Sequence, residues 1–198
     1  QRYPELFDGV VIGAPAMRTG FSNLGLAHAT AMFNRAAPKD AAGKPEPARL
    51  YSSADKAVIL QGLLAQCDAI DGLADGFIEA VAQCKFQPAR LQCAKGQATG
   101  CLDKAQTDAL ADAFEAPRDA AGASLYVDFP YDTGIVFEGM GIPGFLPSAA
   151  PNILGAVAHD PNQSLDALAR KVRADAMQML TDTDAWTNLS SFLQRGGK

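Results

Sequence analysis

Three aspartates, Asp68, Asp71 and Asp75, lie with two glycines, Gly72 and Gly76, inside the nine positions 68–76. Two carboxylates about 4 Å apart repel each other by roughly 4 kcal/mol at an effective dielectric constant near 20. Three carboxylates held together therefore require a cation or a bound proton. Calcium is a hard cation that takes about six to eight oxygen ligands, so it suits this set of donors.

The spacing of these aspartates differs from that of an EF-hand, because Asp68 and Asp71 are separated by two residues and no Glu closes a twelve-residue loop. Backbone carbonyls between and after the aspartates, such as those of Leu73 and Phe77, are available to complete a calcium shell. The alternative is a solvated turn, since Asp and Gly are among the commonest turn residues. The residues alone leave both interpretations open.

The four cysteines, Cys67, Cys84, Cys93 and Cys101, allow three pairings if all are bridged. Sequential pairing would close two short loops, each contributing roughly 2.5–3 kcal/mol in the loop-entropy model. Zinc is the competing interpretation, but the sequence has no CxxC motif and neither histidine lies near the cysteines. Disulfides would indicate a periplasmic or extracellular protein.

The bulk composition is that of a globular chain able to build a sizeable core. The sequence has 198 residues, 48% hydrophobic and 20% charged, with a net charge of −5 and a pI near 4.9. This charge argues against nucleic acid or an anionic membrane surface as the main partner. The longest apolar runs, such as 10–12, are too short to span a bilayer. The first residues contain neither an initiator Met nor a signal peptide, so we expect a piece of a larger protein.

The elements that must position these residues are mainly helical. The apolar run 7–12 predicts a buried strand that leads into a Gly-Ala-Pro loop. Periodicity predicts helices over 23–36, 54–66 with Ser52 or Ser53 as cap, 103–115, 164–180 with Ser164 as cap, and 185–194. A lone buried strand would leave its backbone groups unpaired. We therefore expect its sheet to lie partly outside this chain.

Several stretches of the sequence resemble the tannase and feruloyl esterase family. They are CDAIDGLADGFI, the Cys84-Lys85-Phe86 and Leu91-Gln92-Cys93 triplets, CLDKAQ from Cys101, QRYPELFDGVVIGAPA at the start and LSSFLQRGGK at the end. The resemblance is weakest over 20–50 and 135–180. It implies a secreted or periplasmic α/β-hydrolase with a large inserted lid, in a family that cleaves feruloyl, galloyl and terephthaloyl esters.

The resemblance also implies a division of the chain and a set of site residues. Residues 1–18 would belong to the hydrolase core, 19–180 to a mainly helical, irregular lid, and 181–198 to a helix that returns to the core. A structural Ca²⁺ would be held in the lid. Its ligands would be the side chains of Asp68, Asp71 and Asp75 and the carbonyls of Leu73 and Phe77. The implied disulfides are Cys67–Cys84 and Cys93–Cys101.

No catalytic residue is expected in this chain. The nearest string to G-x-S-x-G is GFSNLG, which contains Ser22, but its second glycine is one place late and no strand precedes it. His28 falls within a predicted helix, and His159 and Asp160 are adjacent, which rarely gives a triad hydrogen bond. The family pattern places the serine nucleophile before this segment and the acid and histidine after it.

Substrate recognition is then the function expected of the chain. The resemblance implies that the lid grips the aromatic acid, and the irregular segment 128–147 supplies the candidate side chains Phe129, Tyr131, Phe137, Met140 and Phe145. The alternative for each is plain core packing. Where relatives often carry tryptophans, this sequence has GMGIPGF, and its only tryptophan is Trp186.

Two functions follow from the sequence. The first is a fragment of a serine esterase whose partners are an aromatic ester and the remainder of the hydrolase domain. The second is a stand-alone, calcium-stabilised binding module without catalysis.

Overall fold

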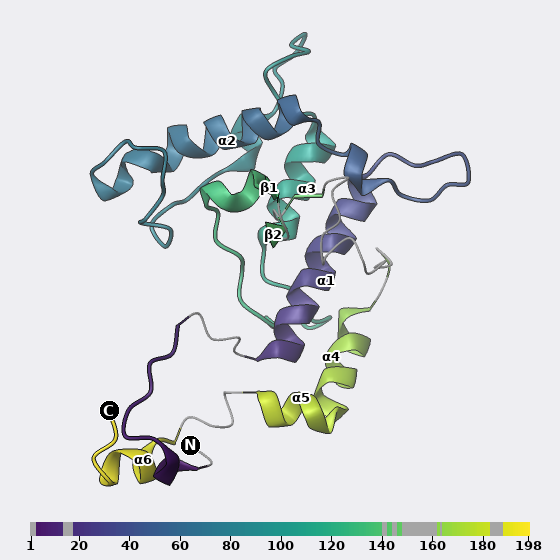
Figure 1. Cartoon of the computed structure of the whole chain (residues 1–198). Coiled ribbons are helices and arrows are strands. Elements are labelled where there is room, and N and C mark those ends of the chain that lie inside the picture. Colours follow the sequence, from purple (N-terminus) through teal and green to yellow (C-terminus); the bar gives the residue numbers. More distant parts are fainter. Residues whose placement is uncertain are drawn as a thin grey trace.

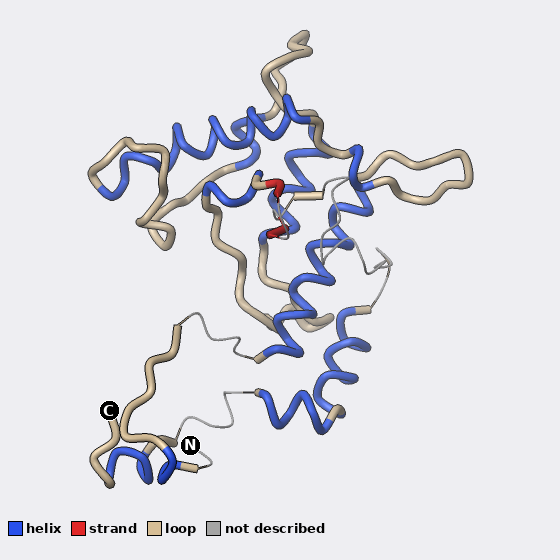
Figure 2. The backbone as a smooth tube through the Cα atoms, viewed as in Figure 1, coloured by secondary structure: helices blue, strands red, loops and turns tan. Residues whose placement is uncertain are grey.

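The structure is a computed structural model that describes residues 3–13, 18–139, 142–143, 146–147, 162, 164–182 and 188–198. Its helices are α1 (Thr19–Ala36), α2 (Ser53–Cys67), α3 (Lys104–Phe114), α4 (Leu165–Ala174), α5 (Ala176–Thr181) and α6 (Ser190–Gln194). Two short strands, β1 (Glu138–Gly139) and β2 (Ile142–Pro143), pair antiparallel. Figure 1 shows the helices in place, and Figure 2 shows how much of the chain is loop.

Helices α1, α2 and α3 share one hydrophobic core. Ile59 and Leu63 of α2 and Leu110 of α3 have no exposed surface, and Phe33 of α1 packs in the same cluster. Full burial of an Ile or Leu side chain stabilises a fold by about 1.5–3 kcal/mol. The apolar stripes predicted for these helices therefore form the core that supports the rest of the chain.

The first turns of α2 and α3 are fixed by two capping boxes. Ser52 caps α2 and exchanges hydrogen bonds with Asp55, while Asp103 caps α3 and exchanges them with Gln106. Gln106 also joins the two helices, because its Nε2 donates to the carbonyl of Leu50 (2.8 Å) and to Asp55 (3.2 Å). The predictions for both helices are confirmed to within one residue at each end.

The helix predicted over 164–180 is wrong in one respect, because the chain divides there into α4 and α5. Ser164 caps α4 as expected, accepting the N–H of Ala167. Asp175 then ends α4 in an extended conformation, and its carboxylate accepts the N–H groups of Met177 (2.8 Å) and Gln178 (3.3 Å). A side chain that caps a new N-terminus competes with continuation of the helix.

Helices α1 and α6 also differ from their predicted bounds. α1 begins at Thr19, four residues before the predicted start at 23, and it ends at Ala36 as predicted. α6 begins only at Ser190, and part of the helix predicted over 185–194 lies outside the described residues.

The N-terminal run 7–12 is extended, but the prediction that it is buried is wrong for this structure: Val11 is fully exposed and Ile12 is 70% exposed. Its described partner is the C-terminal residue. The N–H of Val10 donates to the carbonyl of Lys198 (2.9 Å), and the N–H of Lys198 donates to the carbonyl of Asp8 (3.1 Å). Lys198 thus bonds to the two residues on either side of Gly9, which is the hydrogen-bond pattern of parallel β strands. The two ends of the chain thus lie side by side (Figure 1).

Among the described residues, every helix is too short or too polar to cross a bilayer.

Candidate functional site

The acidic loop, residues 68–79, follows directly from the last turn of α2. A 3-10 turn spans Asp68–Asp71 and ends at Gly72, whose φ of 98° favours glycine. Asp71 accepts the N–H of Leu73 (3.0 Å), and Asp75 accepts that of Phe77 (3.1 Å), in local turns of a kind that aspartate commonly makes. These turns explain why the Asp-Gly pairs fold as a tight loop.

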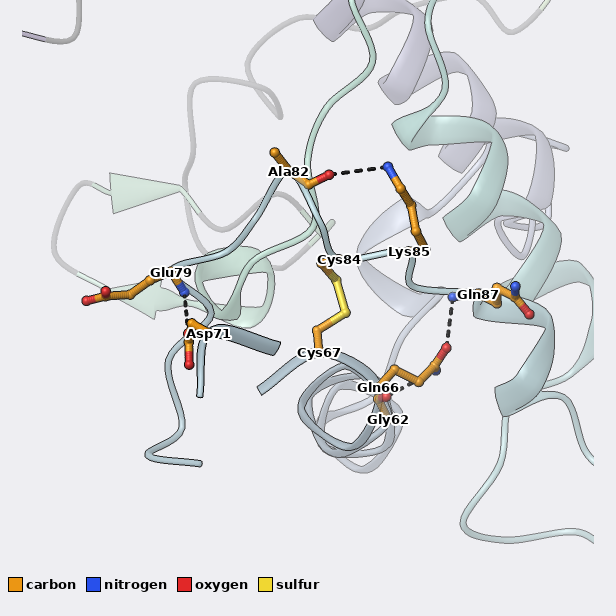
Figure 3. The surroundings of a disulfide bond; sticks show 9 residues. All are labelled: Gly62, Gln66, Cys67, Asp71, Glu79, Ala82, Cys84, Lys85 and Gln87. Carbon is orange, nitrogen blue, oxygen red and sulfur yellow. Dashed lines mark hydrogen bonds between the residues drawn. A yellow bond between two sulfur atoms is a disulfide. The ribbon is translucent and has the colours of Figure 1, made fainter. Parts of the chain in front are cut away.

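Two of the three carboxylates also bridge the loop. Asp68 accepts the N–H of Gly76 (3.1 Å), eight residues away, and Asp71 accepts the N–H of Glu79 (3.2 Å), also eight residues away. Figure 3 shows the second bond beside the Cys67–Cys84 disulfide. The loop is therefore folded around Asp68 and Asp71, with the chain of residues 76–79 held against them.

The polar side chains of the loop are all carboxylates, and carboxylate oxygen is a donor that hard cations prefer. In this respect the loop suits Ca²⁺. The match is incomplete in arrangement, because within the described part of the chain no three Asp, Glu, His or Cys side chains are placed to hold one ion together. The side chains of the two residues expected to lend carbonyls, Leu73 and Phe77, are 62% and 66% exposed.

Both disulfides of the sequential pairing are present. Cys67–Cys84 has a Cα–Cα distance of 5.2 Å and Cys93–Cys101 one of 4.9 Å, within the range that disulfides span. The four sulfur atoms are thereby used, which rules out the zinc alternative. Cys67 is almost completely buried at the end of α2, so the first disulfide ties the acidic loop to the core.

An open cleft of about 1140 Å³ lies beyond this disulfide. Its walls come from three segments: 81–89, which follows the acidic loop, 111–118 around the end of α3, and 124–131. Cys84 itself lines the cleft, so the acidic loop and one cleft wall share a covalent anchor. Five aromatic rings line it: Phe86, Phe114, Tyr126, Phe129 and Tyr131.

Tyr131, one of the residues that line this cleft, is held by contacts of both its ring and its hydroxyl. Its ring stacks on Phe114 at 4.2 Å with an interplanar angle of 9°, and it meets Phe86 edge to face at 4.9 Å. Its hydroxyl donates to the carbonyl of Leu110 (3.2 Å). Burial raises the pKa of Tyr131 above its ordinary value, with Glu115 and Asp112 adding to the effect, so the phenol stays protonated and keeps donating.

The structure brings together some of the predicted substrate residues and separates others. Phe129 and Tyr131 line the cleft, and both are also partly buried against the core. Phe137 is 49% exposed and is not among the residues that line the cleft. Met140, Phe145 and Trp186 lie outside the described residues.

Sequence reasoning missed the rest of the cleft. The sequence predicts no cleft at Phe86, Phe114 or Tyr126, although Phe86 belongs to one of the family motifs and follows Cys84 by two positions. Two cationic side chains also line it. Lys85 donates to the carbonyl of Ala82 (3.2 Å), and Arg118 donates to the carbonyl of Gly122 (3.0 Å). Only the fold places these two residues, 33 positions apart in the sequence, at the same opening.

Ser22 and His28, the residues considered for catalysis, lie within α1 and serve the packing of the fold. Ser22 lies in the first turn of α1, where its N–H donates to the carbonyl of Arg18 (2.9 Å), so no strand-turn-helix elbow presents it. The Nε2 of His28 lies 3.0 Å from the carbonyl oxygen of Asp112, which links α1 to α3. His159 and Asp160 fall outside the described residues.

Comparison with known proteins adds a family match over the whole chain. Residues 1–198 match the family described as tannase and feruloyl esterase. A mono(2-hydroxyethyl) terephthalate hydrolase of Piscinibacter sakaiensis is 34% identical over 147 residues, covering 68% of this chain and 24% of that protein. A probable feruloyl esterase B-1 of Neosartorya fischeri is 31% identical over 150 residues, covering 70% of this chain and 27% of that protein.

Solved structures agree on the fold. The crystal structure of feruloyl esterase B from Aspergillus oryzae superposes with a TM-score of 0.67 at 23% identity, covering 100% of this chain and 39% of that one. A second esterase from Aspergillus oryzae gives a TM-score of 0.63 at 27% identity, with 100% and 38% covered. The matched part of the chain spans about a quarter of the length of the terephthalate hydrolase and of the feruloyl esterase B-1 compared above, and less than two fifths of each solved chain.

Proposed function

Because the chain belongs to the tannase and feruloyl esterase family, we propose that it is the lid-bearing part of an α/β-hydrolase that cleaves esters of aromatic carboxylic acids. The single observation that carries this proposal is the family match along all of residues 1–198. The names of the two curated relatives, a terephthalate monoester hydrolase and a feruloyl esterase, support an aromatic acid as the common part of the substrate.

The paired chain ends support the placement of the lid. Val10 and Lys198 pair in the parallel pattern, as neighbouring strands of an α/β sheet do. A connection between two parallel strands runs from the carboxyl end of the first to the amino end of the second, usually through a helix, and α6, which precedes Lys198, can be that helix. We therefore assign 1–18 and 181–198 to the hydrolase core and 19–180 to the lid.

The aromatic cleft is the part of the lid that we assign to substrate binding. Phe86 and Phe114 are buried, but Tyr126, Phe129 and Tyr131 are partly exposed and offer apolar surface against which a planar aromatic acid can pack. The cleft is also lined by two basic residues, Lys85 and Arg118, and by two acidic ones, Glu115 and Asp128, so its formal charges balance and it offers both hydrogen-bond donors and acceptors to the polar groups of an ester.

The chemical step requires a serine, a histidine and an acid that we place in the remainder of the hydrolase domain. The serine would attack the ester carbonyl, the histidine would carry its proton to the leaving alcohol, and backbone N–H groups would hold the oxyanion. The residues of this chain would bind and orient the ester.

Calcium and secretion belong to the same proposal. Ca²⁺ would be held by Asp68, Asp71 and Asp75 with the carbonyls of Leu73 and Phe77, and it would offset the repulsion among the three carboxylates. The folding of the loop around Asp68 and Asp71 supports this site. The two disulfides support an oxidising compartment, outside the cell or in a periplasm.

The test is an assay of the whole protein and of the 198-residue chain on methyl ferulate, methyl gallate and mono(2-hydroxyethyl) terephthalate. We expect the whole protein to hydrolyse at least one of them and the chain alone to hydrolyse none. If the whole protein turns over no aromatic ester, the proposed activity is wrong. If the flanking sequence also lacks a serine nucleophile, the calcium-stabilised binding module becomes the better explanation.

A further inference from the structure

Arg18 and Asp182 form an ion pair where the helical part of the chain begins and ends. Arg18 is the residue before α1 and Asp182 the residue after α5. The Nε of Arg18 lies 3.6 Å from Oδ1 of Asp182, and the two side chains are only 32% and 14% exposed. The pair thus joins positions 164 residues apart in the sequence.

Neighbouring contacts fasten the same junction. The guanidinium of Arg18 lies over the ring of Phe21, 4.4 Å from its centroid, and that of Arg173 in α4 lies 5.7 Å from the same centroid. Cation–π contacts of this kind are attractive and add to the packing at the junction. The hydroxyl of Thr19 donates to Oε1 of Gln178 at 3.4 Å.

The backbone at this junction is close-packed and strained. A Cβ placed on Gly20 would come within 2.6 Å of both Gln178 and Val172, so the first turn of α1 lies directly against α4 and α5. Arg18 has a φ of 50°, the one positive φ at a non-glycine position among the described residues. Such a conformation is unfavourable for a residue with a side chain and persists where the surrounding structure fixes it.

We propose that Arg18 and Asp182 act as a clasp that fixes the orientation of the helical body, the described residues between 18 and 182, relative to the end pair, residues 3–13 and 188–198. Figure 1 shows the end pair lying apart from α2 and α3, with α1 and α5 nearest to it. The clasp sets the distance between residues 18 and 182, where the chain enters and leaves the helical body. If the proposed function holds, Arg18 and Asp182 are the core residues that border the lid, and their pairing fixes the base from which the lid extends.

Loss of the clasp should alter orientation more than stability. The main core is built by α1, α2 and α3, and neither clasp residue belongs to it. A partly exposed ion pair contributes little to the free energy of folding. Its removal should therefore leave the body folded while the body and the end pair change their relative positions.

The experiment measures a distance distribution across the junction in the 198-residue chain. Spin labels are attached to cysteines introduced at Val11, which is fully exposed, and at Gln61, on the exposed face of α2. Pulsed electron resonance then compares the parent with R18Q, D182N, the double variant and R18K, while helical ellipticity and Tm report on the body. The control removes the exposed ion pair between Lys104 and Asp108 on α3 with K104Q.

We expect R18Q and D182N each to widen the distribution at least twofold, the double variant to widen it no further, and R18K to retain the parent width because it keeps the charge. K104Q should have no effect, and Tm should change by less than about 3 °C in every case. Unchanged widths in both R18Q and D182N would refute the clasp, and so would additive broadening in the double variant. If R18Q fails to fold, D182N decides, since it leaves Arg18 in place. These outcomes do not depend on whether any ester is hydrolysed.

Discussion

The disulfide between Cys67 and Cys84 joins the buried last residue of α2 to the wall of the aromatic cleft. The acidic loop is the segment enclosed by this bond, and Asp71 binds the N–H of Glu79 within it. The position of the segment 81–89 therefore depends on both the disulfide and the loop. This arrangement connects the two candidate sites through the backbone.

Replacement of Cys67 and Cys84 together by alanine should destabilise the chain. The bond closes a sequence separation of 17, for which the loop-entropy model gives about 3 kcal/mol. The matched control is the C93A and C101A double variant, which opens a separation of 8 worth about 2.5 kcal/mol and lies away from the cleft. Denaturant unfolding measures both. Equal stability of the C67A and C84A variant and the parent would contradict the role given to the first disulfide.

Calcium should raise the melting temperature of the chain, and a chelator should lower it. At a concentration 100 times Kd the ion contributes about 2.7 kcal/mol, which is roughly 5–10 °C for a domain of this size. The D71N variant should lose most of this response because it removes one carboxylate charge. D40N is the control, since Asp40 makes a similar turn by accepting the N–H groups of Ala42 and Lys44, outside the acidic loop. Identical melting curves with calcium and with chelator would rule out the ion.

Gln106→Glu should destabilise the protein even though glutamate is a good residue at the third position of a capping box. The carboxylate can still accept the N–H of Asp103, but it cannot donate to the carbonyl of Leu50, and it would lie beside Asp55. We expect a loss of about 1–3 kcal/mol in the free energy of unfolding. Q61E, on the exposed face of α2, should change it by less than about 0.5 kcal/mol. A neutral Q106E would show that the link between the two capping boxes contributes little.

Protonation of His28 should destabilise the fold. Burial lowers its pKa below the ordinary 6.5, as does Arg35, while the bond to the Asp112 carbonyl and the charges of Asp112 and Glu115 oppose this. The folded state therefore binds fewer protons than the unfolded state between the lowered pKa and 6.5. The stability contributed by neutral His28 is complete above about pH 6.5 and is lost as the pH falls toward the lowered pKa.

H28Q provides the comparison for this pH dependence, because glutamine can donate to the Asp112 carbonyl but does not titrate. Chemical denaturation between pH 5 and pH 8, about the range in which a histidine titrates, should show a steeper loss of stability for the parent than for H28Q. Parallel curves would mean that His28 titrates alike in the folded and unfolded states.

The sequence by itself determined the local elements and the covalent frame. Ser52, Asp103 and Ser164 mark the helix starts where the structure has them, because a cap depends on residues three positions away and needs no tertiary contact. The family motifs gave the disulfide pairing, and the spacing of the aspartates gave a tight acidic loop. These are short-range properties of the chain.

Tertiary structure decided what depends on distant partners. The run 7–12 has the composition of a buried strand, yet it is exposed, since burial requires neighbouring strands that the described residues do not supply. Phe86, Phe114 and Tyr131 line one cleft only because α3 and two loops meet there, and Arg18 lies beside Asp182 only because α1 and α5 pack together. Contacts between residues far apart in sequence are set by the packing of whole elements, which no local pattern specifies.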